Sequence, residues 1–316
     1  MRAGTRSRRT MHHSPIVLLL SLLPAVALAQ LADRAPAPKT KSKAQVVMLG
    51  TGTPGFDIDR SGPATAIVVN GTAYLIDAGA GVMRRAEGAY EKGVLALNPP
   101  AIGVVFFTHL HQDHTTGYAD LIYSPAEWRK GPLEVYGPEG IRHMTEHLIE
   151  AYTVRRAPSQ RGNRDVQVDV HEIAAGVVYK DSNVTVTAFP VKHGDNIAYG
   201  YRFQTADRSI VISGDTSPAE SVVENCNGCD VLIHEAYSMY TYNYVTPQMQ
   251  ANRRRMHTSS VELAEIARKA RPGLLILYHR SSLGGQPHGN PEDVLLQEIQ
   301  ALYHGKVVTG HDLEIF

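Results

Sequence analysis

Hydrophobic residues fall into short apolar runs separated by polar turns, a pattern typical of buried strands that alternate with amphipathic helices. The 258–270 segment has its apolar residues on one helical stripe, as expected for a helix that covers a sheet. The predicted strands are 45–49, 65–70, 72–76, 102–107, 132–136, 184–188, 198–204, 209–213, 230–234 and 274–278. The predicted helices are 79–92, 139–151, 217–225, 258–270 and 291–302.

Two hairpins are predicted among these strands. Asn70-Gly71 is a favourable two-residue turn between the strands 65–70 and 72–76, and a second hairpin turns near Ala206-Asp207. Pairs of strands followed by helices recur in the second half of the chain. This order favours an αββα sandwich, in which two sheets pack face to face with helices outside, among the α/β layouts that the periodicity allows.

The first residues predict an export signal. The apolar stretch Ile16 to Val26 follows a positive start and precedes the small-residue site Ala27-Leu28-Ala29. The positive residues are Arg2, Arg6, Arg8 and Arg9. A membrane anchor is the alternative, but the stretch is shorter than the roughly 20 residues of a membrane span. We therefore expect a signal peptide over 1–29, cleavage after Ala29, and a periplasmic or secreted protein with no membrane span after cleavage.

The rest of the chain is expected to be a flexible leader over 30–44 and one domain over 45–316. Residues 30–43 are rich in Ala, Pro and Lys, whereas the whole chain is 43% hydrophobic and 20% charged, as in globular proteins. The chain has 31 basic and 31 acidic residues, and loss of the four signal arginines leaves a net charge of −4. A net acidic chain disfavours nucleic acid as a partner.

Two cysteines, Cys226 and Cys229, stand in a Cys-x-x-Cys pair. In an oxidising compartment, and with no second pair to complete a zinc site, the main expectation is a small structural disulfide. Free thiols are the second interpretation and redox catalysis the third.

The strongest chemical signal is a cluster of three histidines and an aspartate directly after the strand 102–107. His109 and His111 are two residues apart in extended chain, so they face one side and can bind one metal. After the chain turns, Asp113 and His114 can reach a second metal. Imidazole and carboxylate groups are suitable zinc ligands.

Three further polar residues follow predicted strands and can complete two metal positions. His193 follows 184–188, Asp215 follows 209–213, and His279 follows 274–278. A carboxylate can bridge two cations, which suits Asp215 because the small Gly214 beside it leaves it accessible.

The order His-x-His-x-Asp-His, a later His, Gly-Asp-Thr and a final His resembles the metallo-β-lactamase superfamily. Additional motifs resemble its ribonuclease Z branch, which also includes a periplasmic arylsulfatase-type group. The resemblance covers about residues 45–316. The motifs are Leu49-Gly50-Thr51-Gly52-Thr53-Pro54, Leu75-Ile76-Asp77-Ala78-Gly79, Tyr136-Gly137-Pro138, His234-Glu235-Ala236 and His257-Thr258-Ser259.

This resemblance implies a ligand set and roles. It implies that two Zn²⁺ ions hold a hydroxide between them, which Asp113 orients, although manganese and iron accept similar ligands. Asp77 would brace the histidine-rich loop, and His257, paired with Glu235, would protonate the leaving group. The implied ligands are His109, His111 and His193 for the first zinc, Asp113, His114 and His279 for the second, and Asp215 for both.

The resulting expectation is an exported hydrolase of small anionic esters, either aryl sulfates or phosphodiesters. Ribonuclease Z carries a tRNA-gripping arm between the third-His and Gly-Asp-Thr motifs, and here residues 194–214 leave no room for one. A ribonuclease Z-like endonuclease is therefore disfavoured. A lactonase or β-lactamase-type acyl hydrolase and a non-catalytic metal-binding protein stay open, as does a homodimer.

Two weaker features lie near the end of the predicted site. Tyrosines at 237, 240, 242 and 244 either line an aryl-binding pocket or belong to a packed surface loop. The run Arg253-Arg254-Arg255 is interpreted as a solvated charge run, with an anion-gripping role as the alternative.

Overall fold

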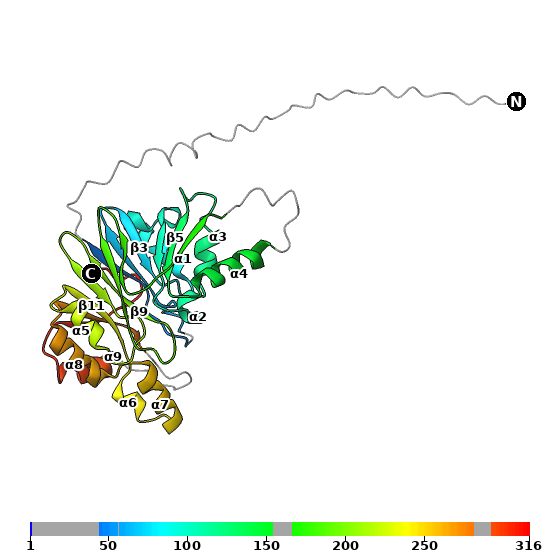
Figure 1. The fold of residues 1–316 in the computed structure, drawn as a ribbon. Coiled ribbons are helices and arrows are strands. Elements are labelled where there is room, and N and C mark those ends of the chain that lie inside the picture. The colour runs from blue at the N-terminus through cyan, green and yellow to red at the C-terminus, as the bar shows by residue number, and fades with distance from the viewer. Residues whose placement is uncertain (2–43, 56, 154–165, 281–291) are drawn as a thin grey trace. The chain divides into compact units, whose positions relative to one another are not determined.

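The computed structural model describes Met1 and residues 44–55, 57–153, 166–280 and 292–316 (Figure 1). The signal peptide beyond Met1, its cleavage site and leader residues 30–43 lie outside the described residues. Ala44 is buried, and its carbonyl accepts a hydrogen bond from the Arg208 guanidinium at 2.7 Å. Ala44 therefore belongs to the folded domain and not, as predicted, to the leader.

The first sheet has six strands in the order of the chain. The two junctions β1–β2 and β2–β3 are antiparallel, and the following three are parallel. Its strands are β1 Gln45–Gly50, β2 Ala64–Val69, β3 Thr72–Ile76, β4 Val104–Phe106, β5 Leu133–Gly137 and β6 Val168–Glu172.

The second sheet has seven strands, also in sequence order. Antiparallel pairing from β7 to β10 changes to parallel pairing from β10 to β13. Both halves of the chain thus repeat a scheme of antiparallel strands followed by parallel ones. Its strands are β7 Gly176–Lys180, β8 Thr185–Pro190, β9 Tyr199–Gln204, β10 Ser209–Ile212, β11 Val231–Ala236, β12 Leu274–Arg280 and β13 Val307–Thr309.

Helices cover the outer faces of the two sheets. In Figure 1, α1, α3 and α4 lie beside the first sheet, while α5, α8 and α9 lie beside the second. The layers are therefore αββα, which confirms the predicted fold class. The α-helices are α1 Val82–Glu91, α2 Gln112–Thr115, α3 Tyr118–Tyr123, α4 Ile141–Thr153, α5 Glu220–Cys226, α6 Met239–Tyr242, α7 Pro247–Met256, α8 Ser260–Ala270 and α9 Glu292–Gln300; the 3₁₀ turns are η2 Leu95–Leu97 and η3 Pro99–Ala101.

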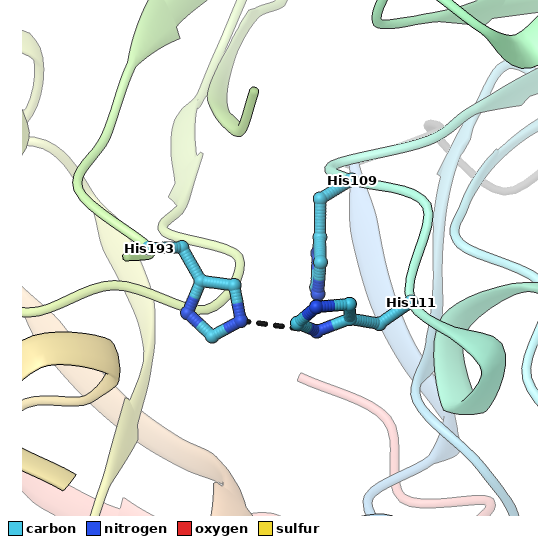
Figure 2. A group of neighbouring side chains, drawn as sticks. All are labelled: His109, His111 and His193. Atoms are coloured by element: carbon cyan, nitrogen blue, oxygen red, sulfur yellow. Dashed lines mark hydrogen bonds between the residues drawn. The ribbon is translucent and has the colours of Figure 1, made fainter. Parts of the chain in front are cut away.

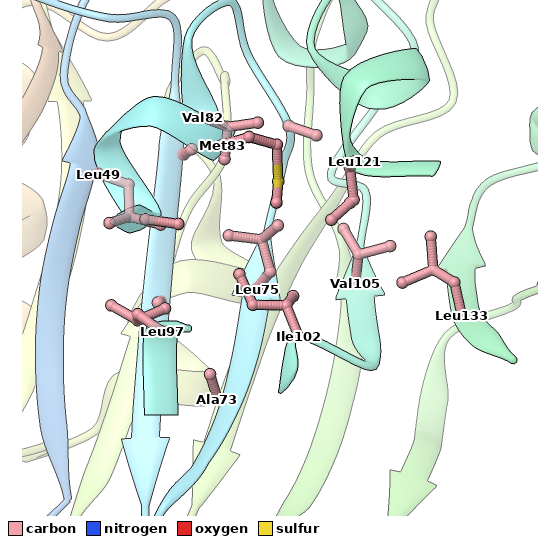
Figure 3. Packing of buried hydrophobic residues seen from close by; sticks show 14 of the residues in the cluster. Leu49, Ala73, Leu75, Val82, Met83, Leu97, Ile102, Val105, Leu121 and Leu133 are labelled. Atoms are coloured by element: carbon pink, nitrogen blue, oxygen red, sulfur yellow. The ribbon is translucent and has the colours of Figure 1, made fainter. Parts of the chain in front are cut away.

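Three apolar clusters hold the layers together. One packs the first sheet against its helices and includes Leu75, Val82 and Leu121 (Figure 3). A second lies between the sheets, around Phe106, and a third joins the second sheet to α5, α8 and α9. Each fully buried leucine or phenylalanine stabilises the fold by roughly 2 kcal/mol. The packing of these faces therefore determines which strand ends lie close together.

The local signals explain most element bounds. Asn70 and Gly71 have φ angles of 50° and 78°, as a two-residue turn that joins β2 and β3 requires. The β9–β10 hairpin forms as predicted. Helix α1 starts at Val82, later than predicted, because Gly81 has a left-handed φ of 87°. Cys226 and Cys229 are joined by a disulfide, which confirms the main expectation for this pair.

The end of the chain closes the free edge of β1. Val46 and Phe316 exchange backbone hydrogen bonds at 3.0 and 2.9 Å, and Met48 N donates to Glu314 O at 3.0 Å. Within the part of the chain that the structure describes, no helix is both long and apolar enough to cross a bilayer.

Candidate metal centre

The predicted ligands meet where the ends of strands from both sheets converge. The first sheet supplies His109 and His111 from the loop after β4, and Asp113 and His114 from α2. The second sheet supplies the other three, which follow β8, follow β10 or lie near the end of β12. These three residues are His193, Asp215 and His279.

The two sets of side chains face each other at short distances. His111 Nδ1 lies 3.1 Å from His193 Nε2, across the gap that Figure 2 shows. His279 Nε2 lies 3.1 Å from Asp113 Oδ2. The structure therefore brings together residues up to 170 positions apart (His109 to His279), and within this set each sheet holds part of both predicted ligand groups.

Asp215 lies between the two groups. Its Oδ1 is 3.4 Å from His114 Nε2 and 3.3 Å from His279 Nδ1, and its Oδ2 is 3.9 Å from His193 Nε2. One carboxylate thus contacts residues of both predicted positions.

Several groups of these side chains have the spacing of a metal site. Within each group, one nitrogen or carboxylate oxygen per residue lies within 4.8 Å of the others. His257 also joins two such groups. The groups are His109 with His111 and His193; Asp113 with His114 and His279; His109 with His114 and Asp215; His193 with Asp215 and His257; and Glu235 with His257 and His279.

Buried polar atoms without partners show that these residues suit a cation. Each such atom costs about 1–3 kcal/mol if nothing replaces its water. Imidazole nitrogen lone pairs and carboxylate oxygens that converge without donors are the ligands that a divalent transition metal requires. Among the described residues, the site atoms that lack a hydrogen-bond partner are His109 Nε2, His114 Nε2, Asp215 Oδ1 and His279 Nδ1.

The Nδ1 atoms of several site histidines are occupied by neighbours, which directs their Nε2 atoms to the centre. His114 Nδ1 lies 2.8 Å from Asp77 Oδ2, and His193 Nδ1 lies 2.7 Å from the Met256 carbonyl oxygen. Because carboxylate and carbonyl oxygens only accept, both Nδ1 atoms donate, and their Nε2 lone pairs stay available as ligands.

Asp77 braces the histidine-rich loop, as the resemblance implied. It is 1% exposed, adopts a left-handed φ of 59°, and accepts hydrogen bonds from the Thr108 amide and from His114. A non-glycine residue in this conformation costs about 1–2 kcal/mol, so the surrounding contacts hold it there.

His279 is aimed at the centre by an irregularity in β12. Glu235 pairs with Tyr278 and Ala236 pairs with Arg280, so His279 is the extra residue of a β-bulge, with a φ of 40°. A bulge turns a side chain out of the regular alternation of a strand. The apolar run before His279 predicted the strand but not this local turn.

His257 is held beside the centre by a short segment with several anchors. Thr258 Oγ1 donates to the Thr216 carbonyl at 2.7 Å, and Ser259 caps α8 in a capping box with Glu262. Such a cap contributes roughly 1 kcal/mol to a helix. The His-Thr-Ser motif therefore fixes the chain at the position where His257 Nδ1 contacts Glu235 Oε1, at 2.9 Å.

Burial and neighbouring charges set the protonation of this region. Burial lowers the pKa of His257, but the adjacent Glu235 carboxylate outweighs it and raises the pKa to about 9. Burial raises the pKa of Asp215, but His279 and His114 outweigh it and hold that pKa well below its ordinary value. The lowered pKa favours the ionised form of Asp215, which suits contact with cations.

A cavity of about 470 Å³ opens onto these residues. Its lining includes side chains that sequence reasoning did not assign to the site, namely Thr53, Gln112, Asn252 and Met256. Thr53 lies in a motif quoted for the family. Asn252 and Met256 come from α7, whose polar sequence gave no amphipathic signal.

The tyrosines of the predicted aryl pocket do not line this cavity. Tyr237 and Tyr242 are buried and stacked on each other, with ring centres 5.5 Å apart, while Tyr240 and Tyr244 are exposed. They correspond to the packed surface loop that was the alternative.

The arginine run agrees in part with the solvated charge run that we expected, because Arg254 and Arg255 are exposed, whereas Arg253 is not. Arg253 is buried against the ring of Tyr237, and Arg254 hydrogen-bonds Tyr242. Arg255 pairs with Asp195 at 2.7 Å. The three arginines lie outside the described lining of the cavity, so the geometry does not support the anion-gripping alternative.

Comparisons with known proteins agree with this geometry. Residues 72–280 match the family model described as a beta-lactamase superfamily domain. The chain is 31% identical over 247 residues to a protein named ribonuclease Z from Mycobacterium sp. (strain KMS), covering 74% of this chain and 83% of that protein.

Solved structures share the fold. The short form of human tRNase Z (ELAC1) matches with a TM-score of 0.65 and 23% identity, over 86% of this chain and 98% of that one. A diphosphatase from the PhnP family matches with a TM-score of 0.61 and 21% identity, over 87% and 97%. The motifs, the αββα layers, the convergent His/Asp cluster and the extent of these matches together show that the chain is a metal-dependent hydrolase of the metallo-β-lactamase superfamily, in its ribonuclease Z-like branch.

Proposed function

We propose that the chain hydrolyses monoanionic esters, with phosphodiesters of modest size as the first candidate substrates and aryl sulfates as the second. The observation that carries the proposal is the charge of the cavity. Its described lining contains Asp113, Asp215 and several histidines, but no lysine or arginine. Binding of an anion in this cavity therefore depends on the cations that the His/Asp cluster would hold.

The ligand distances support the predicted assignment to two positions. His109, His111 and His193 would hold one cation, and Asp113, His114 and His279 the other, with Asp215 shared. Zinc is the metal that we propose, because neutral imidazoles and carboxylates suit it. When bound, two such cations lower the pKa of water and neutralise negative charge on a substrate oxygen.

Charge balance favours a substrate with a single negative charge. Three aspartates, the buried Asp77 and Asp215 and the half-buried Asp113, would offset most of the charge of two divalent cations. The neighbouring Glu235–His257 pair adds little net charge when it shares its proton. Together with one hydroxide, the aspartates would balance the charge of the cations. A phosphodiester or a sulfate monoester then adds one negative charge to the cavity, whereas a phosphate monoester adds two and is accommodated less well.

The chain's own residues supply proton transfer and orientation. Asp113 lines the cavity and would orient the attacking water through a carboxylate oxygen. His257 lines the same cavity, and Glu235 occupies its Nδ1, so Nε2 is the atom that would give a proton to the leaving oxygen. A positioned general acid of this kind contributes roughly 10²–10⁴-fold to rate.

Two observations rank the substrates. Curated relatives carry the name ribonuclease Z, and ribonucleases cleave phosphodiester bonds, which puts phosphodiesters before sulfates. Between His193 and Asp215 the chain forms the antiparallel hairpin of β9 and β10 with short connections, and this interval has no inserted domain. We therefore propose small diesters, and not precursor tRNA, as substrates.

The proposal includes export and cleavage after Ala29, supported by the arginine-rich start and the apolar stretch that follows it. Mass spectrometry of the protein recovered from its native compartment tests this point. A mature chain that starts at Gln30 supports it, and a chain that retains Met1 in the cytoplasm contradicts it.

The activity test uses the zinc-loaded chain with five substrates in parallel. These are bis-nitrophenyl phosphate, nitrophenyl sulfate, nitrophenyl phosphate as the dianionic control, a homoserine lactone and a chromogenic β-lactam. Precursor tRNA forms a sixth arm. Faster turnover of the diester or the sulfate than of the dianion supports the proposal. Turnover of the lactone or β-lactam alone would support an acyl hydrolase instead. Cleavage of tRNA alone would support a ribonuclease Z-like endonuclease.

A further inference from the structure

Thr108 has a hydroxyl group that touches both Asp77 and His109. Its side chain is completely buried, and its Oγ1 lies 2.9 and 3.1 Å from the two carboxylate oxygens of Asp77. The same Oγ1 lies 3.0 Å from His109 Nδ1. The hydroxyl therefore stands between a buried acid and a histidine of the metal centre.

The number of protons on these atoms fixes the direction of both hydrogen bonds. A hydroxyl has one proton to donate, and an ionised carboxylate can only accept, so Thr108 donates to Asp77. The lone pairs of Thr108 then face His109 Nδ1, which must donate to make the second bond. His109 Nε2 is left with a lone pair, and that atom is buried without a hydrogen-bond partner among the described residues.

The opposite tautomer would break two interactions. A proton on Nε2 of His109 would point into a site whose described residues offer it no acceptor at hydrogen-bond distance. Thr108 would then have to turn its proton to Nδ1 and lose its bond to Asp77. A buried polar group that loses its hydrogen bond destabilises the structure, which favours the first arrangement.

We propose that Thr108 is a positioning residue that sets the tautomer of His109 and so links the first metal position to Asp77. This inference rests on the ligand assignment of the proposed function. Asp77 then reaches both positions by different routes, directly through His114 and indirectly through Thr108 and His109. Loss of the hydroxyl should weaken one position, whereas loss of the carboxylate should weaken both.

The test is calorimetric titration of zinc into the metal-free full chain and three variants. Thr108→Val removes the hydroxyl at nearly constant shape, Thr108→Ser is the matched control that keeps it, and Asp77→Asn removes the shared charge. We expect Thr108→Val to lower one of two zinc affinities by about 10–100-fold, as is common for residues that orient a ligand. Thr108→Ser should stay within a few-fold of the unsubstituted chain, and Asp77→Asn should weaken both affinities.

A second measurement does not depend on any variant. Nitrogen NMR of the imidazole rings in the unsubstituted metal-free chain should show the His109 proton on Nδ1. A proton on Nε2 overturns the inference, as does a Thr108→Val chain with two unchanged zinc affinities or a Thr108→Ser chain as impaired as Thr108→Val. If no ester is hydrolysed but the affinities change as stated, the proposed substrates fall and the role of Thr108 stands.

Discussion

Glu235 Oε1 accepts two hydrogen bonds of 2.9 Å, one from His257 Nδ1 and one from the backbone amide of Thr216. Glu235 is completely buried, whereas His257 reaches the cavity. The Thr216 amide thus holds the Glu235 carboxylate in place, and Glu235 in turn orients His257 beside the metal centre. One carboxylate couples the chain at Asp215 to the group that we assign as general acid.

His257→Ala separates the role of general acid from that of metal ligand. The chain should keep two zinc ions and lose about 10²–10⁴-fold in turnover, most strongly with poor leaving groups, which need a proton most. Metal content by mass spectrometry and rates over a series of aryl leaving groups check this. Loss of zinc would identify His257 as a ligand, consistent with its short distances to His193 and Asp215.

Glu235→Gln should shift the pH dependence while metal content stays constant. Burial lowers the pKa of His257 and the Glu235 carboxylate raises it to about 9, so a neutral amide should lower it. A general acid works when protonated, so activity falls as pH rises through its pKa. The alkaline limb of the kcat profile should therefore move to lower pH. An unchanged limb would show that another group donates the proton.

Asp215→Ala should abolish binding of both metals or all activity. Asp215 contacts residues of both predicted positions, and its removal leaves His114 and His279 without the charge that faces them. Zinc titration and turnover of the diester measure the effect. Asp195→Ala is a suitable control, because it also removes one carboxylate, but an exposed one that pairs with Arg255. A fully metallated, active Asp215→Ala chain would refute the bridging assignment.

Gly214→Ala should destabilise the fold by more than Gly71→Ala. Both glycines have left-handed φ angles, 63° and 78°, where alanine costs about 1–2 kcal/mol. A Cβ at Gly214 would also lie 2.9 Å from the Cβ of Thr108, whereas nothing lies within 4 Å of one at Gly71. Urea unfolding of the two variants gives the comparison. Equal losses would mean that the loop at Gly214 relaxes without cost.

Asp181→Asn should destabilise the chain at neutral pH but not in acid. Burial raises the pKa of Asp181, but hydrogen bonds from Tyr74, Val184, Asn183 and Tyr179 outweigh it and hold the pKa below its ordinary value. A lowered pKa stabilises the fold above the unfolded-state value of about 3.9, and this stabilisation is lost as pH falls through the folded-state value.

Chemical unfolding at a series of pH values measures this difference. The difference in unfolding free energy between the unsubstituted chain and Asp181→Asn should be at most about 1 kcal/mol near pH 7, because solvent screens this partly exposed carboxylate, and it should shrink below about pH 4. A stability difference that does not depend on pH would mean that the negative charge of Asp181 does not account for its stabilising effect.

Strands buried on both faces were predictable because their residues form continuous apolar runs. The run around Phe106 and the one before His279 gave β4 and β12 within one or two residues. The edge strands β6 and β7 were missed because they are partly exposed and mix charged with apolar residues, as in Val168–Glu172. Helix α7 was missed because its mostly polar sequence has no apolar stripe at helical spacing.

The candidate metal residues were predictable from types and order, but their supports were not. The ligand types between His109 and His114 are clustered within six residues, and the later histidines follow predicted strands. The bulge that turns His279, the strained backbone of Asp77 and the hydroxyl of Thr108 depend on partners distant in sequence, so local patterns do not encode them. The same holds for Asn252, which lines the cavity from a helix without a signal.

The pairing of residues 313–316 with β1 has a consequence for biosynthesis. β1 is the first strand of the domain to leave the ribosome, and Val46 and Met48 on its outer edge bond to residues made after nearly the whole domain. Until then the nascent chain displays an unpaired edge beside a strongly apolar strand, the kind of surface that recruits other strands. The hydrogen bonds on the outer edge of β1 therefore form only after the last residues of the domain have been added.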